Sequence, residues 1–158
     1  MALDSRKCMA SIIEKIEAQT SVERQIDFLD LHSSYALKIV LGYGMDPGCK
    51  WLLPESDPPY TPLFNAADQE EKFYSECKKL MYFVDTDEGR TVKQIKREQL
   101  FIQILESVDP RDAKLILRMK NKQLKISMEA VKQAFPNLTK HWEIPTENKT
   151  PKAAKAKK

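Results

Sequence analysis

The dipeptide Asp109-Pro110, set in the middle of the longest helical pattern of the chain, constrains the fold more than any other feature. Apolar residues recur at helical spacing between residues 92 and 108, which is typical of a helix that packs one face into a core. Because Pro110 disfavours helical geometry in the preceding residue and has no backbone N–H, this helix must end near residue 108. Asp109 is a good N-cap and proline suits the first helical position, so a second helix begins at once. Residues 95–124 are therefore predicted to form two helices joined by a very short corner.

The first helix of this pair indicates which residues build the core. Phe101 and Leu105 lie on its widest apolar stripe, so we expect both side chains to be buried. Replacing either by alanine is expected to cost about 2–5 kcal/mol of stability. Val92 and Ile95 belong to the same predicted stripe, whereas Arg97 falls on the predicted solvent side.

Helical patterns also dominate the rest of the chain, and no strongly alternating strand pattern appears in the sequence. We therefore expect an all-α fold, a compact bundle of five to six helices in one domain over residues 1–146. Trp142 is expected to anchor the end of this domain. Residues 147–158 contain no large apolar side chain, which predicts a disordered Lys-rich tail. The further predicted helices cover residues 5–19, 22–42, 68–84 and 127–135.

Residues 44–66 differ from the rest because their proline density excludes a continuous helix. Trp51 and Tyr60 are nevertheless too apolar for a free linker. We interpret the segment as an ordered Pro-rich strap whose side chains pack on the helices, because exposing Trp51 would forfeit a large gain from burial. The alternative is a surface that docks a partner protein. The candidate docking residues are Trp51, Pro58, Pro59 and Tyr60.

The formal net charge of +3 is distributed unevenly along the chain. Residues 149–158 hold five lysines and no acid, and residues 93–125 hold nine basic residues against four acidic ones. A helix pair with excess Lys and Arg favours weak, sequence-independent binding of DNA or RNA. An exposed basic face is also the ordinary surface of a soluble helix, so both interpretations stay open. The candidate nucleic-acid-binding residues are Arg97, Arg111, Lys114, Arg118, Lys120 and Lys122 in the helix pair and Lys152, Lys155, Lys157 and Lys158 in the tail.

The sequence carries no recognisable motif for catalysis or metal binding. Cys8, Cys49 and Cys77 are widely spaced and form no CxxC pair, so we expect reduced thiols. His32 and His141 lie far apart in sequence, and nothing local pairs a histidine with a cysteine nucleophile. We therefore expect a non-enzymatic protein without metal or cofactor.

Three sequence blocks, occurring in order, carry a resemblance to a known family. They are KWLLPESDPPYTP at 50–62, the stretch from Ile95 to Leu124, and VKQAFPNL at 131–138. Together they resemble a family of small proteins encoded by tailed bacteriophages, common among T4-like viruses and their cyanophage relatives and catalogued as a domain of unknown function. The resemblance implies a phage protein that acts in an infected bacterium. It implies no activity, cofactor or site residue.

Three functions remain open on the sequence. The first is a phage accessory protein that associates weakly with nucleic acid through the basic helix pair and the tail. The second is an adaptor or host-takeover factor that docks through the strap, and the third is a minor virion component. No run of the sequence approaches the ~20 apolar residues of a membrane span, and the first residues lack the apolar core of a secretion signal. The expected location is therefore the host cytoplasm.

Overall fold

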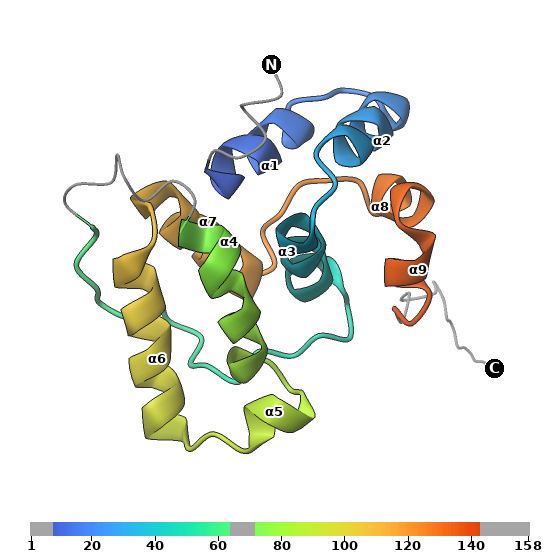
Figure 1. Ribbon diagram of the computed structural model, residues 1–158. Helices are drawn as coiled ribbons and strands as arrows, with labels where there is room; N and C mark the ends of the chain where they lie inside the picture. Colours follow the sequence, from blue (N-terminus) through green and yellow to red (C-terminus); the bar gives the residue numbers. More distant parts are fainter. Residues whose placement is uncertain (1–7, 64–71, 143–158) are drawn as a thin grey trace.

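The computed structural model describes residues 8–63 and 72–142, and within these ranges the chain is helical, with one isolated β-bridge between Trp51 and Val84 (Figure 1). The predicted all-α fold is confirmed. The predicted tail, residues 147–158, lies outside the described residues. The elements are α1 (Met9–Glu17), α2 (Val22–Leu31), α3 (Tyr35–Met45), α4 (Lys72–Glu76), the 3-10 helix η3 (Cys77–Phe83), α5 (Asp87–Arg90), α6 (Gln94–Ser107), α7 (Pro110–Lys120), α8 (Met128–Ala134) and α9 (Pro136–Thr139).

The corner between α6 and α7 has the predicted form. Asp109 is the N-cap of α7, where its side chain accepts a hydrogen bond from the Arg111 backbone N–H at 2.8 Å, and Pro110 occupies the first helical position. Phe101 and Leu105 are buried, as predicted. Helix α7 packs against α1, α3 and α6, so the corner supplies the centre of the bundle (Figure 1).

The side of α6 that faces the core differs from the predicted one. Ile95 is 74% exposed, whereas Arg97 is only 5% exposed. The predicted solvent-side position of Arg97 is therefore wrong. Its guanidinium group finds backbone carbonyls to bind inside the fold, so an arginine takes the place of an apolar residue one turn before Phe101.

The helix predicted over residues 22–42 is two helices, α2 and α3. The break falls at Ser33 and Ser34, where Ser34 is the N-cap of α3 and its hydroxyl accepts from the Leu37 backbone N–H at 3.0 Å. A serine that caps a new helix competes with continuation of the old one. The continuous apolar pattern on both sides of the serines masked this signal.

The helix predicted over residues 68–84 is described from residue 72 onward and is α-helical only as far as Glu76. The chain continues as the 3-10 helix η3, in which Cys77, Leu80 and Phe83 are buried at a spacing of three residues. This spacing matches the three residues per turn of a 3-10 helix, so η3 presents one narrow apolar edge to the core.

The end of the described chain is held by packing. Trp142 is 7% exposed and belongs to the same core as α8 and α9, which confirms its predicted anchoring role. Pro136 directly follows the helix predicted over residues 127–135 and is the first residue of α9.

Candidate nucleic-acid interface

Arg97, a candidate from the sequence, is a buried structural residue. Its Nε donates to the carbonyl of Tyr82 at 3.2 Å, and its Nη2 donates to the carbonyls of Gly89 and Val92, both at 2.7 Å. Its Nη1 donates to the side-chain oxygen of Gln94. These acceptors lie at the end of η3, in α5 and in the turn before α6, so one guanidinium group joins three segments. Only 5% of Arg97 is exposed, so little of its surface can meet a phosphate.

Lys120 holds the strap against the end of α7. Its ammonium group donates to the carbonyls of Pro54 at 3.1 Å and Glu55 at 3.0 Å, and it lies 3.4 Å from the carboxylate of Asp57. The Asn121 side-chain oxygen is a further acceptor at 3.2 Å. The side chain of Lys120 is 3% exposed, so its charge is paired inside the protein and does not face a ligand.

Arg118 and Lys122 also bind the protein itself. Arg118 forms an ion pair with Glu17 of α1 at 2.5 Å. Lys122 donates to the carbonyls of Tyr43 and Asp46, at 3.1 and 3.2 Å, where α3 ends. Both cations satisfy chain ends or carboxylates of other elements and are only partly available to a ligand.

Arg111 and Lys114 are the candidates of the helix pair that remain at the surface. Arg111 has a half-exposed side chain and pairs with the buried carboxylate of Asp109 at 3.0 Å. Burial alone would raise the pKa of Asp109, but the hydrogen bonds and charge of Arg111 outweigh it and lower that pKa. Lys114 is exposed on α7. The helix pair therefore presents far less free positive charge than its sequence indicates.

The other sequence candidates lie in the tail and the strap. Lys152, Lys155, Lys157 and Lys158 fall outside the described residues. In the strap, the Trp51 indole N–H donates to the Tyr43 carbonyl at 3.0 Å, and its ring meets the edge of the Phe101 ring with centroids 6.5 Å apart. Tyr60 is half-buried and packs against the core. The predicted packing of Trp51 and Tyr60 on the helices is confirmed.

The two prolines among the candidate docking residues have a different position. A groove of about 240 Å³ remains between the strap and α6. Pro58 and Pro59 line it from the strap, and Phe101 and Ile102 line it from α6. The groove is one part of the strap region that stays open to a partner.

A buried carboxyl–thiol pair joins the starts of α1 and α7. Asp112 Oδ1 accepts from the Ala10 backbone N–H at 2.8 Å and from the Cys8 thiol at 3.2 Å, so Asp112 caps α1 across the fold. Asp112 Oδ2 is buried and has no hydrogen-bond partner among the described residues. Burial raises the pKa of Asp112 to about 6 and that of Cys8 to about 12. Cys8 therefore stays a thiol at neutral pH and is not an activated nucleophile.

A group of lysines on α3, α4, η3 and the start of α6 carries more exposed charge. Lys72, Glu76, Lys79 and Leu100 line one hollow between α4, η3 and α6. The lysines at 93 and 96 precede Leu100 by seven and four residues, so they lie on the same side of α6. Glu76 pairs with Lys79 at 3.0 Å. We call this surface the lysine face; it comprises Lys38 of α3, Lys72 of α4, Lys78 and Lys79 of η3, and Lys93 and Lys96 at the start of α6.

The sequence held a signal for the lysine face. Lys78 and Lys79 stand side by side between the buried Cys77 and Leu80 and can only point outward. The local net charge does not single out these two lysines, because acidic residues at positions 68, 70 and 71 precede them closely in sequence.

The described ranges of the chain are helical and contain no strand. Residues 12–126 match the model of a family of unknown function, DUF6433. The chain belongs to this family. No curated protein and no solved structure matches it. Within the described residues, no helix is both long and apolar enough to cross a membrane.

Proposed function

We propose that this protein is a non-enzymatic accessory protein that associates weakly and without sequence preference with nucleic acid. The observation that carries the proposal is the lysine face, where six lysines stand beside the carboxylate of Glu76, and Asp85 and Asp87 border it only at its α5 end. A surface with such a surplus of ammonium groups attracts a phosphate backbone by releasing its condensed counterions. The resemblance to tailed-phage proteins supports an infected bacterium as the setting.

The charge of the whole chain supports the same proposal. Residues 72–142 hold fifteen basic and nine acidic residues, whereas residues 8–63 hold four basic and eight acidic ones. Two helices of the N-terminal part, α1 and α2, thus form an acidic end that would repel a polyanion, and the lysine face and the tail would attract it. The molecule therefore has a preferred side for nucleic acid.

The test is the salt dependence of binding to duplex DNA by the full-length protein. If all five tail lysines neutralise a phosphate, they contribute about 4–5 to the slope of log affinity against log salt. The matched variant replaces these five lysines by glutamine within the full chain. Loss of binding in this variant assigns the affinity to the tail, and retained binding assigns it to the folded part. Absence of retention on DNA or RNA even near 50 mM salt would remove the proposal.

A second candidate function is protein docking at the groove between the strap and α6. The observation that favours it is the carboxylate of Glu98 beside an apolar floor of Phe101 and Ile102; the carboxylate of Asp57, which also lines the groove, is already paired with Lys120. This arrangement suits a peptide with an apolar side chain next to a cation. The test is capture from infected cells, with nuclease present, by the wild type and by Ile102→Arg. The control is Ile95→Arg, which changes an exposed isoleucine of the same helix outside the groove.

A further inference from the structure

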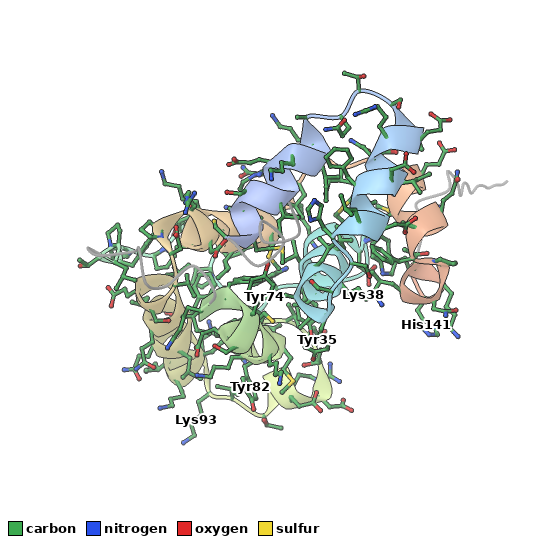
Figure 2. The ribbon with its side chains drawn as sticks, turned by 45° about the horizontal axis from the view of Figure 1, so that its top comes forward. Tyr35, Lys38, Tyr74, Tyr82, Lys93 and His141 are labelled. Atoms are coloured by element: carbon green, nitrogen blue, oxygen red, sulfur yellow. The ribbon has the colours of Figure 1, made fainter. Side chains whose placement is uncertain are left out.

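Three tyrosines accompany the lysine face. Tyr35, the first residue of α3, is 62% exposed, and Tyr74 and Tyr82 on α4 and η3 are half-buried and pack partly against the core. Figure 2 shows Tyr35, Tyr74 and Tyr82 across one side of the molecule, with Lys38 at one end of the row and Lys93 at the other. Aromatic rings and ammonium groups therefore lie on the same side of the molecule.

The two upper tyrosines enclose a space. Tyr35 and Tyr74 line a surface hollow of about 360 Å³, and Leu31, 72% exposed, lines it as well. The hydroxyl-bearing residues Ser33 and Ser34 complete the rim. The hollow thus offers aromatic and apolar side chains for a flat ring and hydroxyl groups for its polar edge.

We infer that the lysine face with Tyr35, Tyr74 and Tyr82 is a binding site for single-stranded nucleic acid, an inference that rests on the proposed nucleic-acid function. Bases of a single strand expose their faces and stack on aromatic side chains, while neighbouring lysines follow the phosphates. In a duplex the base faces are covered by their neighbours, so the tyrosines would find no partner there. The aromatic rings are what distinguish this site from a general basic surface.

The tyrosines favour a nucleic acid over an acidic protein as the ligand, because bases stack on aromatic rings whereas a carboxylate has no flat ring to stack. The lysine face contains lysines only, and lysine binds phosphate as a point charge. The arginine of the adjoining helix α5, Arg90, is held by Asp85 and Asp87. These carboxylates also border the site at its α5 end, which limits a bound strand to the surface between α3 and α6.

The experiment measures fluorescence anisotropy of a labelled oligothymidylate of about 12 nucleotides and of a duplex of the same length, with full-length protein at about 50 mM salt. Tyr35→Ala removes a largely exposed ring, so the fold is unaffected. We expect it to weaken single-strand binding roughly fivefold or more, with little effect on the duplex. The control Ile95→Ala removes an equally exposed apolar side chain outside the face and is expected to change neither affinity.

Three outcomes would overturn the inference, and they are distinguishable from one another. If the wild type binds neither probe, the proposed function fails and the site fails with it. If the wild type binds but Tyr35→Ala and Tyr82→Leu both match it, nucleic-acid association stands and its location in this face is wrong. Equal loss of single-strand and duplex affinity in Tyr35→Ala would show that the ring does not stack on bases.

Discussion

The buried cations of α6 and α7, Arg97 and Lys120, differ from the lysines of the lysine face, which lie at the surface. Arg97 and Lys120 each donate to several carbonyls from segments that lack regular partners, namely the strap, α5 and the turn before α6. Lys78 and Lys79 stand on η3 with exposed side chains, and Lys79 pairs with the surface carboxylate of Glu76. Irregular segments leave backbone acceptors unpaired, and long cationic side chains supply the missing donors. Arg97 and Lys120 are thus structural cations here, whereas the lysines of η3 stay at the surface.

The largest effect that separates the two groups is expected at Arg97. Arg97→Met should lower the free energy of unfolding by about 3–5 kcal/mol, because the carbonyls of Gly89 and Val92 would lose their charged donor inside the protein. Lys96→Met, the preceding residue on the exposed side, should stay within about 0.5 kcal/mol of the wild type. Urea denaturation of both variants measures the difference. Equal stability of the two would mean that Arg97 is not needed inside the fold.

The second prediction concerns Asp112, the buried acid of α7. The pKa of Asp112 is about 6 in the folded state against 3.8 for the ordinary group, so the folded state binds the proton more tightly. The contribution of Asp112 to stability is therefore fully present below pH 3.8 and declines as the pH rises to about 6. Between these limits the free energy of unfolding of the wild type should fall by about 3 kcal/mol relative to Asp112→Asn, measured by denaturation at each pH. A difference between the two proteins that does not change with pH would contradict the burial of an unpaired carboxyl oxygen.

A smaller effect is expected at Lys120, whose ammonium group fixes the strap. Lys120→Met should cost about 2 kcal/mol and expose residues 54–57 to limited proteolysis, because the Pro54 and Glu55 carbonyls lose their donor. Lys114→Met, on the exposed side of the same helix, serves as the control. Mass spectrometry of early fragments locates the cleavage. Protection of the strap in both variants would show that Trp51 and Tyr60 hold it without Lys120.

The smallest effect on stability is expected on the lysine face. The double variant Lys78→Gln/Lys79→Gln removes two exposed charges and one surface ion pair, that with Glu76. Its free energy of unfolding should lie within about 0.5 kcal/mol of the wild type. Strong destabilisation would place these lysines with the structural cations and erase the contrast between the two regions.

Local signals in the sequence were enough to predict the α6–α7 corner. Asp109 and Pro110 act on their immediate neighbours, and the burial of Phe101 and Leu105 follows from helical spacing alone. The cap at Ser34 is local as well, but the apolar pattern on both sides outweighed it in the prediction. Fold class and core thus follow from residues within about one turn of each other.

Which charged residues are buried and which are exposed could not be predicted in the same way. Lys120 meets the Pro54 carbonyl across 66 positions of sequence, and Arg118 meets Glu17 across 101. Whether such a cation is buried depends on which carbonyls the fold leaves unpaired, and this is decided only when the segments meet. A count of charge along residues 93–125 therefore overstated the positive charge available to a ligand.

The central claim is that a polyanion meets the lysine face and not the surface of α7 that carries Arg111 and Lys114. The most direct measurement is the salt dependence of oligothymidylate binding by two matched double variants of the full chain, Lys78→Gln/Lys79→Gln and Arg111→Gln/Lys114→Gln. Each phosphate contact on a single strand contributes about 0.7 to the slope of log affinity against log salt. We predict that the first variant lowers this slope by about 1.4 and that the second leaves it unchanged. The reverse pattern, with the loss confined to Arg111→Gln/Lys114→Gln, would contradict the claim.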